Sequence, residues 1–196
     1  MKSVYNFVVT PKGERYNNKK KLKNSELILN TEIFNHHYIN REAVVLSTPI
    51  IGNTDIKPGD TVVLHHNVFR RWHNQHGVEK NSRSYFNDKT YLVNHDQIFL
   101  YKRNKNWQAP KGYCFVQPIK STNSFDVEIE QPLQGVVKYS DGTVNTGDLV
   151  GFRPGSEYEF IIENKKLYRV LSKFITIKYE YQGNEETYNP SWTQSG

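Results

Sequence analysis

Few residues of this chain have the types and the spacing that metal chemistry needs. Two histidines, His73 and His76, form a His-x-x-His pair that could supply two ligands to a metal ion. No cysteine or carboxylate cluster stands beside this pair at ligand spacing, so we expect no metal site. The histidines of the chain are His36, His37, His65, His66, His73, His76 and His95.

A catalytic centre is not indicated either. The sequence holds no Ser-His-Asp signature, no phosphate-binding loop and no GxGxxG dinucleotide fingerprint. The single cysteine, Cys114, falls in a predicted strand, where a small buried apolar role is favoured over a reactive thiol. We therefore expect no catalytic residues, no cofactor and no enzyme activity.

One stretch has the pattern of a binding segment. Leu27, Ile28 and Leu29 form an aliphatic tripeptide between the basic run NNKKKLKN (17–24) and a polar stretch that holds His36 and His37. Such a tripeptide could dock into an apolar groove of a partner. Alternatively, it forms an ordinary short strand against the body of the protein, and the lysines beside it are a solvated face.

Composition bounds the elements that must position this segment. The chain has 196 residues, enough for one large domain or two small ones, and 13% of them are aromatic, which favours strands. One cysteine permits no internal disulfide and fits a reducing compartment. No apolar run is long enough for a signal peptide or a membrane span, so we expect a soluble cytoplasmic protein. The net charge of +6 suits either simple solubility or an acidic or nucleic-acid partner.

Short apolar runs punctuated by turn residues predict an all-β fold. Only NVFRRWHNQHG (67–77) has a helical spacing, with Phe69, Trp72, His73 and His76 on one face, and it is too short to change the class. The predicted strands are NFVV, AVVLST, DTVVLHH, TYLV, QIFLYK, YCFVQP, GVVKY, DLVGF, YEFII, LYRVL and FITIKY.

An internal repeat organises these strands. Four pairs of segments align in the same order, and the offset between partners shrinks from each pair to the next. The strands therefore agree while the connections of the second copy are shorter. The pairs are FVVTP (7–11) with CFVQP (114–118), AVV (43–45) with GVV (135–137), IKPGDTVVL (56–64) with VNTGDLVGF (144–152), and YLVNHDQIFL (91–100) with YRVLSKFITI (168–177).

The repeat predicts two domains, 1–108 and 111–180, followed by a polar tail, 181–196. Each copy carries a Gly-Asp turn between two strands, Gly59-Asp60 and Gly147-Asp148, where glycine suits a positive φ and aspartate can cap backbone N–H groups.

The order of parts resembles the GroES-type co-chaperonin family (chaperonin-10). A first strand ends in proline, a long loop and a G-x-V-like strand follow, then V-x-x-GD-x-V-x-F, and a Y-x-V strand precedes a closing I-x-x-I strand. The stretch most similar to the family is NTGDLVGFRPGSEYEFIIENKKLYRVLSKFITI (145–177). The resemblance implies two tandem GroES-like small β-barrels. Tandem members occur among chloroplast co-chaperonins, and phages carry diverged single ones; a phage-encoded protein would act in the host cytoplasm.

The resemblance also implies a role for the aliphatic tripeptide. In this family a mobile loop after the first strand docks an apolar tripeptide on the large chaperonin ring, so Leu27, Ile28 and Leu29 are the expected chaperonin-binding residues, in a mobile loop over 12–42. The corresponding loop of the second copy, over 119–134, is about half as long and has no aliphatic tripeptide at a comparable place.

Two features depart from the family pattern or have no counterpart in it. The spans LSTPIIGNTDIKP and KYSDGTVNT are too short for the long roof hairpin of bacterial members, which predicts an open top. The first copy also has an insert over 65–90, where the second copy has only the shorter connection over 153–167.

Three classes of function remain. The first is a co-chaperonin that caps a chaperonin ring, assists folding of an unfolded client protein and forms a homo-oligomer in which first strands pair with the closing strands of neighbours. The second is a viral structural or assembly protein that uses the same barrels for oligomeric contacts. The third, less favoured, is a nucleic-acid-binding β-barrel, because aromatic and basic residues interleave in VFRRWH and YKRNKNW. No membrane partner is expected.

Overall fold

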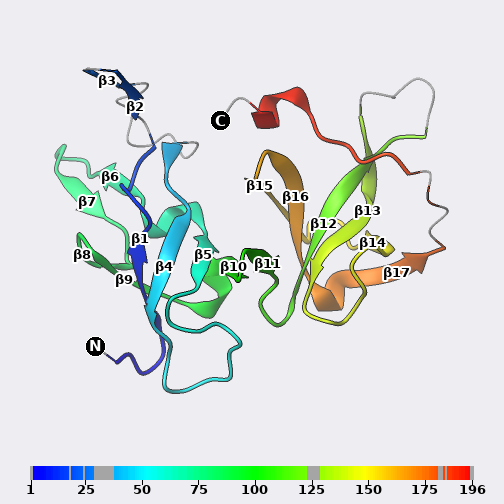
Figure 1. Cartoon of the computed structure of the whole chain (residues 1–196), viewed down its shortest axis with the longest axis horizontal. Coiled ribbons are helices and arrows are strands. Elements are labelled where there is room, and N and C mark those ends of the chain that lie inside the picture. Colours follow the sequence, from blue (N-terminus) through cyan, green and yellow to red (C-terminus); the bar gives the residue numbers. More distant parts are fainter. Residues whose placement is uncertain are drawn as a thin grey trace. The chain divides into compact units, whose positions relative to one another are not determined.

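A computed structural model describes residues 2–17, 19–23, 25–28, 38–122, 129–180, 183 and 185–194 (Figure 1). The chain divides into two compact units, Met1–Asn106 and Trp107–Gly196, which we call the first and second unit. Their described residues form β-strands, turns and short 3-10 helices, so the predicted all-β class is confirmed. No helix in these residues is long and apolar enough to cross a membrane.

The first unit is built on a seven-stranded sheet in the order β11-β10-β5-β4-β1-β9-β8, whose edge strand β11 begins at the unit's last residue, Asn106, and ends in the second unit. Two hairpins, each a separate two-stranded sheet, extend it. The sheet strands are β1 (Phe7–Pro11), β4 (Glu42–Ser47), β5 (Thr61–Leu64), β8 (Tyr85–Asn87), β9 (Thr90–Val93), β10 (Ile98–Arg103) and β11 (Asn106–Gln108). The hairpins are β2 (Lys19–Leu22) with β3 (Ser25–Ile28) and β6 (Arg71–His73) with β7 (Glu79–Asn81), and the 3-10 helices are η2 (His66–Val68) and η3 (His95–Gln97).

The second unit has a six-stranded sheet in the order β15-β16-β12-β13-β14-β17. Its strands are β12 (Tyr113–Lys120), β13 (Glu130–Ser140), β14 (Leu149–Phe152), β15 (Glu157–Ile162), β16 (Lys165–Leu171) and β17 (Ile175–Tyr179), and its 3-10 helices are η4 (Ser172–Phe174) and η5 (Ser191–Gln194).

The two sheets repeat one strand order and one register. The run β8-β9-β1-β4-β5-β10 of the first sheet corresponds, strand by strand, to the whole order of the second. Val9 opposes Val45, and their aligned counterparts Val116 and Val137 oppose each other. Each of these pairs directly follows an irregularity at the same point of the strand. The segments aligned from sequence thus occupy equivalent places in the two sheets.

The Gly-Asp turns are equivalent in detail as well. Gly59 and Gly147 have φ of +92° and +94°, a region that favours glycine. Each donates its N–H to a β-strand carbonyl at 2.8 Å. Asp60 and Asp148 each accept a hydrogen bond from the backbone N–H three residues earlier, at 2.8 and 3.0 Å. The aspartates cap the turn as predicted.

One hydrophobic cluster of the second unit corresponds, position by position, to part of the first unit's core. Five buried side chains, packed together under the second sheet, all align with buried residues of the first. They are Val116, Val137, Val150, Phe152 and Val170, matched by Val9, Val45, Val62, Leu64 and Val93. The first core extends further, over Tyr16 and Ile39 from the long loop and Val68 and Phe69 from the insert.

Two expectations need revision. The pairings of the described strands close neither sheet, so the two predicted barrels are not confirmed. β1 and β12 each have strand partners on both sides, so they are not free to pair with the closing strand of a neighbour.

Described residues of the polar tail contact β12. Lys120 N donates to Glu186 O and Tyr188 N donates to Pro118 O, both at 2.8 Å.

The predicted helix over 67–77 is wrong. Phe69 is fully buried whereas Trp72 is 43% exposed, so the two do not share a face. Only a short 3-10 turn precedes Phe69, and the chain then turns back as a hairpin. Asn74 Oδ1 accepts from the backbone N–H groups of His76 and Val78, and Gly77 takes a φ of +73°, which together make a tight turn between β6 and β7.

Candidate functional site

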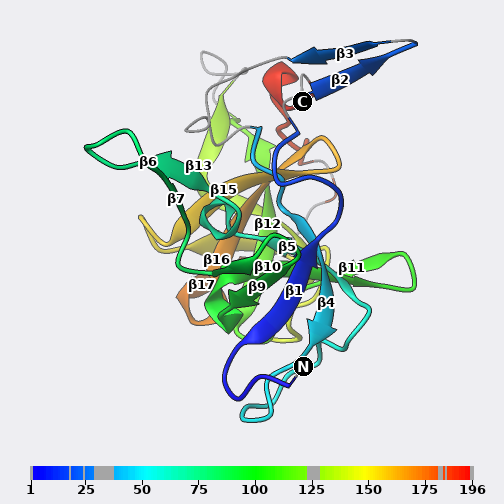
Figure 2. The ribbon, with the colours of Figure 1, turned by 90° about the vertical axis from the view of Figure 1, so that its left-hand side faces the viewer.

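The aliphatic tripeptide lies on a hairpin that stands off the first sheet, which we call the arm (Figures 1 and 2). β3 pairs with β2 in register, with Leu27 opposite Lys20 and Ile28 opposite Lys19. Leu27 is 49% exposed, and Leu29 lies outside the described residues. A strand is present, as the alternative interpretation required, but among the described strands it pairs with β2 and not with the sheet. Of the tripeptide's side chains, the structure describes that of Leu27, which is about half exposed.

The root of the arm is built into the core. Tyr16 and Ile39 face each other in a β-bridge, and they are only 6% and 3% exposed. Backbone hydrogen bonds tie the two sides together, from Asn17 N to Tyr38 O at 2.7 Å and from Asn40 N to Arg15 O at 2.9 Å. The loop is thus fixed at its base, and only the residues beyond the base can project.

Asn40 clamps this base with its side chain. The residue is 4% exposed, and its amide Nδ2 donates to Lys12 O at 3.1 Å and to Glu14 O at 2.8 Å. Its Oδ1 accepts from Glu42 N at 2.9 Å. A buried amide with three satisfied bonds fixes where the arm leaves β1 and where it returns to β4.

The insert braces the same root. The Tyr16 hydroxyl accepts a hydrogen bond from Arg71 N at 2.8 Å, and the Arg71 guanidinium lies 4.8 Å from the Tyr16 ring centre. Because Arg71 begins β6, the hairpin of the insert is joined directly to the arm. The insert, which has no counterpart in the family pattern, therefore supports the long loop.

Arg15 makes the second connection between arm root and insert. Its guanidinium donates to Phe69 O at 3.1 Å and to Asn81 Oδ1 at 2.8 Å, and it lies over the rings of Tyr85 and Tyr91. Burial raises the pKa of Tyr91 to about 12, although the nearby Arg15 charge opposes the rise. One cation thus links the start of the arm, the insert and the core.

The described ends of the matching loop in the second unit, 119–122 and 129–134, form no comparable root. They continue the β12–β13 ladder, with Ser121 N donating to Ile129 O at 2.8 Å and Lys120 opposite Glu130. An ionic cluster lies at these ends, in which Lys166 lies 2.9 Å from both Glu130 and Glu159.

The other chemical candidates are not drawn together. His73 ends β6 and His76 lies in the following turn, both exposed, and among the described residues no group of three metal-ligating side chains occurs. His36 and His37 fall outside those residues. Cys114 is in β12 and fully buried, as predicted. Its sulfur lies 3.4 Å from Ser172 Oγ, whose hydroxyl donates to Asp141.

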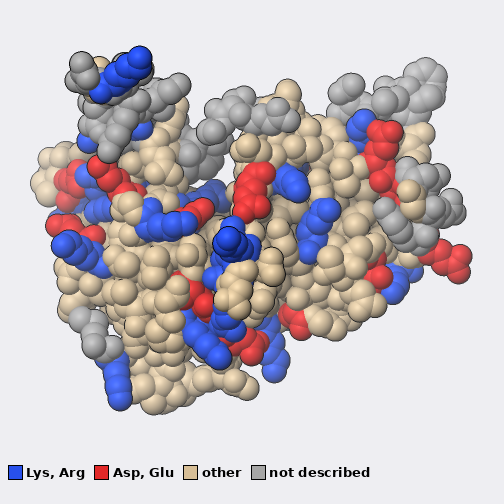
Figure 3. All heavy atoms as spheres, viewed as in Figure 1, with Lys and Arg blue, Asp and Glu red and all other residues tan. Residues whose placement is uncertain are grey.

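Charge is divided unevenly between the units. The first has 17 lysines and arginines against 9 aspartates and glutamates, a net charge of +8. The second has 9 against 11, a net charge of −2. Figure 3 shows basic side chains at the outer end of the arm. The positive first unit would therefore bind a negatively charged partner more readily than a neutral one.

No protein-family model and no curated protein sequence matches this chain. Sequence reasoning located the tripeptide but missed Tyr16, Asn40 and Arg15, the residues that hold the arm. Tyr16 was the available signal, since an aromatic residue close to the start of a polar loop suggests an anchor.

Proposed function

We propose that this protein is a co-chaperonin that caps a chaperonin ring, assists the folding of a client protein and docks through Leu27, Ile28 and Leu29. The observation that carries the proposal is the arm itself. A strand with an exposed leucine is held away from the sheet on a root that is buried and hydrogen-bonded. A protein with no use for this segment would gain stability by packing it.

The finer assignment of the fold belongs to the same proposal. The common strand order and register of the two sheets support two GroES-like units in tandem, as the sequence resemblance implies. The first unit carries the docking arm, and the second serves as scaffold. Assembly into a homo-oligomer would use exposed sheet edges, such as β17 or β15, rather than β1.

The energetics suit a cap that must bind and leave. A buried aliphatic side chain contributes on the order of 1.5–3 kcal/mol, so one tripeptide binds weakly once ordering costs are subtracted. Several arms on one oligomer raise the total affinity through effective concentration. Release then requires only that the individual contacts weaken together.

Substitution in the tripeptide tests the proposal. We expect Ile28→Asp to abolish co-sedimentation with a chaperonin ring in the presence of nucleotide and to leave thermal unfolding unchanged. The matched control is Ile129→Asp, which alters a 54% exposed isoleucine at the end of the corresponding second-unit loop. That variant should bind the ring like the unmodified protein. Equal loss of binding in both variants would contradict the proposal.

Protection from trypsin gives an independent measurement. The lysines at 19, 20, 21 and 23 lie on the arm, and we expect cleavage there before cleavage in the sheets. A bound ring should slow this cleavage and leave cleavage of the second unit unchanged. If several chaperonin rings give no protection while the protein is a stable oligomer, the viral structural or assembly role becomes the better assignment. A stable monomer at micromolar concentration would count against both.

A further inference from the structure

We propose that the outer face of the β6–β7 hairpin and the residues that flank it bind single-stranded nucleic acid. We call this surface the basic hairpin and define it by Arg70, Trp72, Lys80 and Arg83. It lies in the insert of the first unit, and it does not involve the tripeptide or depend on the docking function proposed above.

The positive charge of the insert is only partly compensated. The insert contains five lysines and arginines and only two acidic residues. Both acidic residues are engaged within the insert, Glu79 with Arg71 at 3.3 Å and Asp88 with the Tyr85 hydroxyl at 2.9 Å. Among the described residues no salt bridge engages the three cations of the basic hairpin, which are Arg70, Lys80 and Arg83. Moreover, Arg70 Nε is buried without a hydrogen-bond acceptor.

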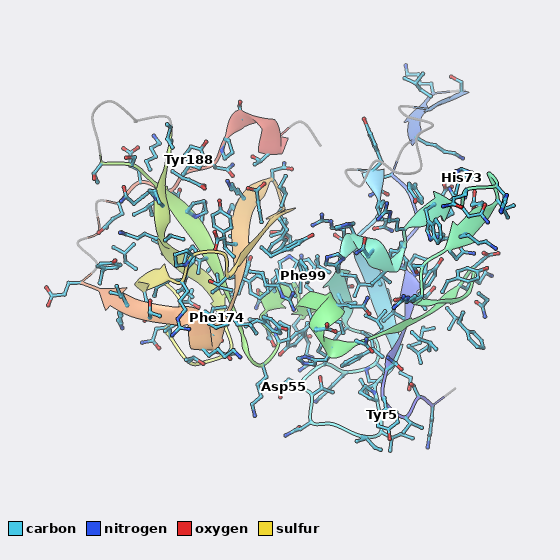
Figure 4. All side chains as sticks on the ribbon, turned by 180° about the vertical axis from the view of Figure 1, so that it is seen from behind. Tyr5, Asp55, His73, Phe99, Phe174 and Tyr188 are labelled. Atoms are coloured by element: carbon cyan, nitrogen blue, oxygen red, sulfur yellow. The ribbon has the colours of Figure 1, made fainter. Side chains whose placement is uncertain are left out.

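An exposed aromatic ring lies beside one of these cations, Lys80. Side chains alternate along a strand, and Arg71 turns toward Tyr16, so Trp72 faces the other way and is 43% exposed. Trp72 lies directly opposite Lys80 in the ladder, which places the two side chains on one face at about 5 Å between Cβ atoms. Figure 4 labels His73, the next residue of the same strand, at the outer side of the first unit.

The second unit differs in its charge, and three of its nine lysines and arginines have carboxylate partners. Lys120, Lys166 and Lys178 each lie within 2.9 Å of a carboxylate oxygen. The unit as a whole is acidic. Positive charge is therefore not a general property of this chain's surface but is concentrated in the unit that also carries the exposed tryptophan.

This combination favours a single strand over other polyanions. Cations contact phosphates, and an exposed indole stacks on an unpaired base, a contact that any base can make. A duplex buries the faces of its bases, so it would use the charges and not the ring. An acidic peptide would likewise leave the indole without a matching partner.

Fluorescence anisotropy of a labelled oligothymidylate of about 20 nucleotides tests the inference. The full chain should bind it at low salt and release it as salt rises. Trp72→Ala should weaken binding about 5-fold or more, because base stacking is lost. Lys80→Glu combined with Arg83→Glu should weaken it at least as much and lower the salt slope by about 0.7 for each lost phosphate contact. An unlabelled duplex of the same length should compete poorly.

Matched variants make the test decisive. Lys23→Glu changes an exposed lysine on the arm and Ile177→Ala removes a 50% exposed apolar side chain from β17; each should leave affinity within about 2-fold. If Lys23→Glu weakens binding as much as the double variant, the site is not the basic hairpin. An unaffected Trp72→Ala variant, equal competition by polyglutamate, or no binding at low salt would each overturn the inference. Chaperonin binding by Trp72→Ala should be unchanged, which separates this site from the arm.

Discussion

The two units share one order of six strands but connect these strands with segments of different length. The loop between the first two aligned strands covers 12–42 in the first unit but only 119–134 in the second. The connection between the third and fourth covers 65–90 in the first unit and 153–167 in the second. In the first unit the two longer connections meet, because Tyr16 and Arg15 of the arm root contact the insert at Arg71, Phe69 and Asn81.

The difference teaches that the extra residues form one structure. A projecting loop needs a fixed base. The five core positions that the two units share lie on the sheet strands, and none of them belongs to the arm root. The insert provides the base by adding Val68 and Phe69 beneath the arm root. The second unit lacks an insert of this length, and its loop ends simply continue the sheet. Predictions that treat the units as a matched pair can test this account.

The largest effect should come from the arm root. Tyr16→Ala removes a buried ring, its hydrogen bond to Arg71 N and its contact with the guanidinium, and we expect the free energy of unfolding to fall by about 3–5 kcal/mol. Urea unfolding measures it. Tyr16→Phe should cost about 1 kcal/mol, because only the hydroxyl is lost. A cost for Tyr16→Ala no larger than that for Tyr5→Ala, which alters a 72% exposed tyrosine, would mean that the root is not anchored.

An intermediate effect is expected where the copies differ by one methyl group. Gly135 aligns with Ala43, yet a Cβ on Gly135 would lie 2.3 Å from Gln117 O. Gly135→Ala should therefore destabilise the protein by about 3 kcal/mol, with the second unit affected first. Ala43→Gly should cost about 1 kcal/mol, from a more flexible chain and a lost buried methyl group. Hydrogen exchange measured separately for the amides of each unit distinguishes the two variants. Equal costs would show that the two ladders are more alike than their contacts indicate.

The smallest effect concerns the aligned tyrosines Tyr91 and Tyr168. The Tyr91 hydroxyl is buried without a hydrogen-bond partner, so Tyr91→Phe should leave stability unchanged or raise it. The Tyr168 hydroxyl donates to Glu130, so Tyr168→Phe should cost about 1.5 kcal/mol. Opposite signs in urea unfolding at neutral pH would support the comparison, and a loss in both variants would contradict it.

Tyr91 and Tyr168 should both contribute to a loss of stability at alkaline pH. Burial is the largest cause that raises the pKa of each tyrosine from 10.0 to about 12 in the folded protein. A raised folded pKa means that stability is complete below pH 10 and is lost as pH rises toward 12. We expect the double Phe variant to lose less stability over this window than the unmodified protein. Equal losses would show that neither phenol controls the alkaline transition.

Most strands of the two sheets were predictable because their apolar runs are short, β-branched and bounded by turns, whereas β8 and β11 of the first sheet were not predicted. The repeat was predictable because each aligned core position keeps an aliphatic or aromatic side chain. The β2–β3 and β6–β7 hairpins were not predictable. Their sequences are polar, and their strands pair with no other described strand. In residues 67–77 the spacing of the apolar side chains suggested a helix. Asn74 and Gly77 are residues typical of a turn, and they could have indicated the hairpin instead. The arm root depends on contacts between distant residues, which periodicity cannot reveal.

The bond between the Tyr16 hydroxyl and Arg71 N joins residues 55 positions apart, and this separation has a consequence during synthesis. The arm hairpin needs only its own neighbouring residues, so it can form soon after Ile28 leaves the ribosome. Its root cannot be completed until the insert has emerged and packed. For that interval the nascent chain carries an aliphatic strand whose base lacks its contacts with the insert, and a chaperone that meets the chain then could bind this segment.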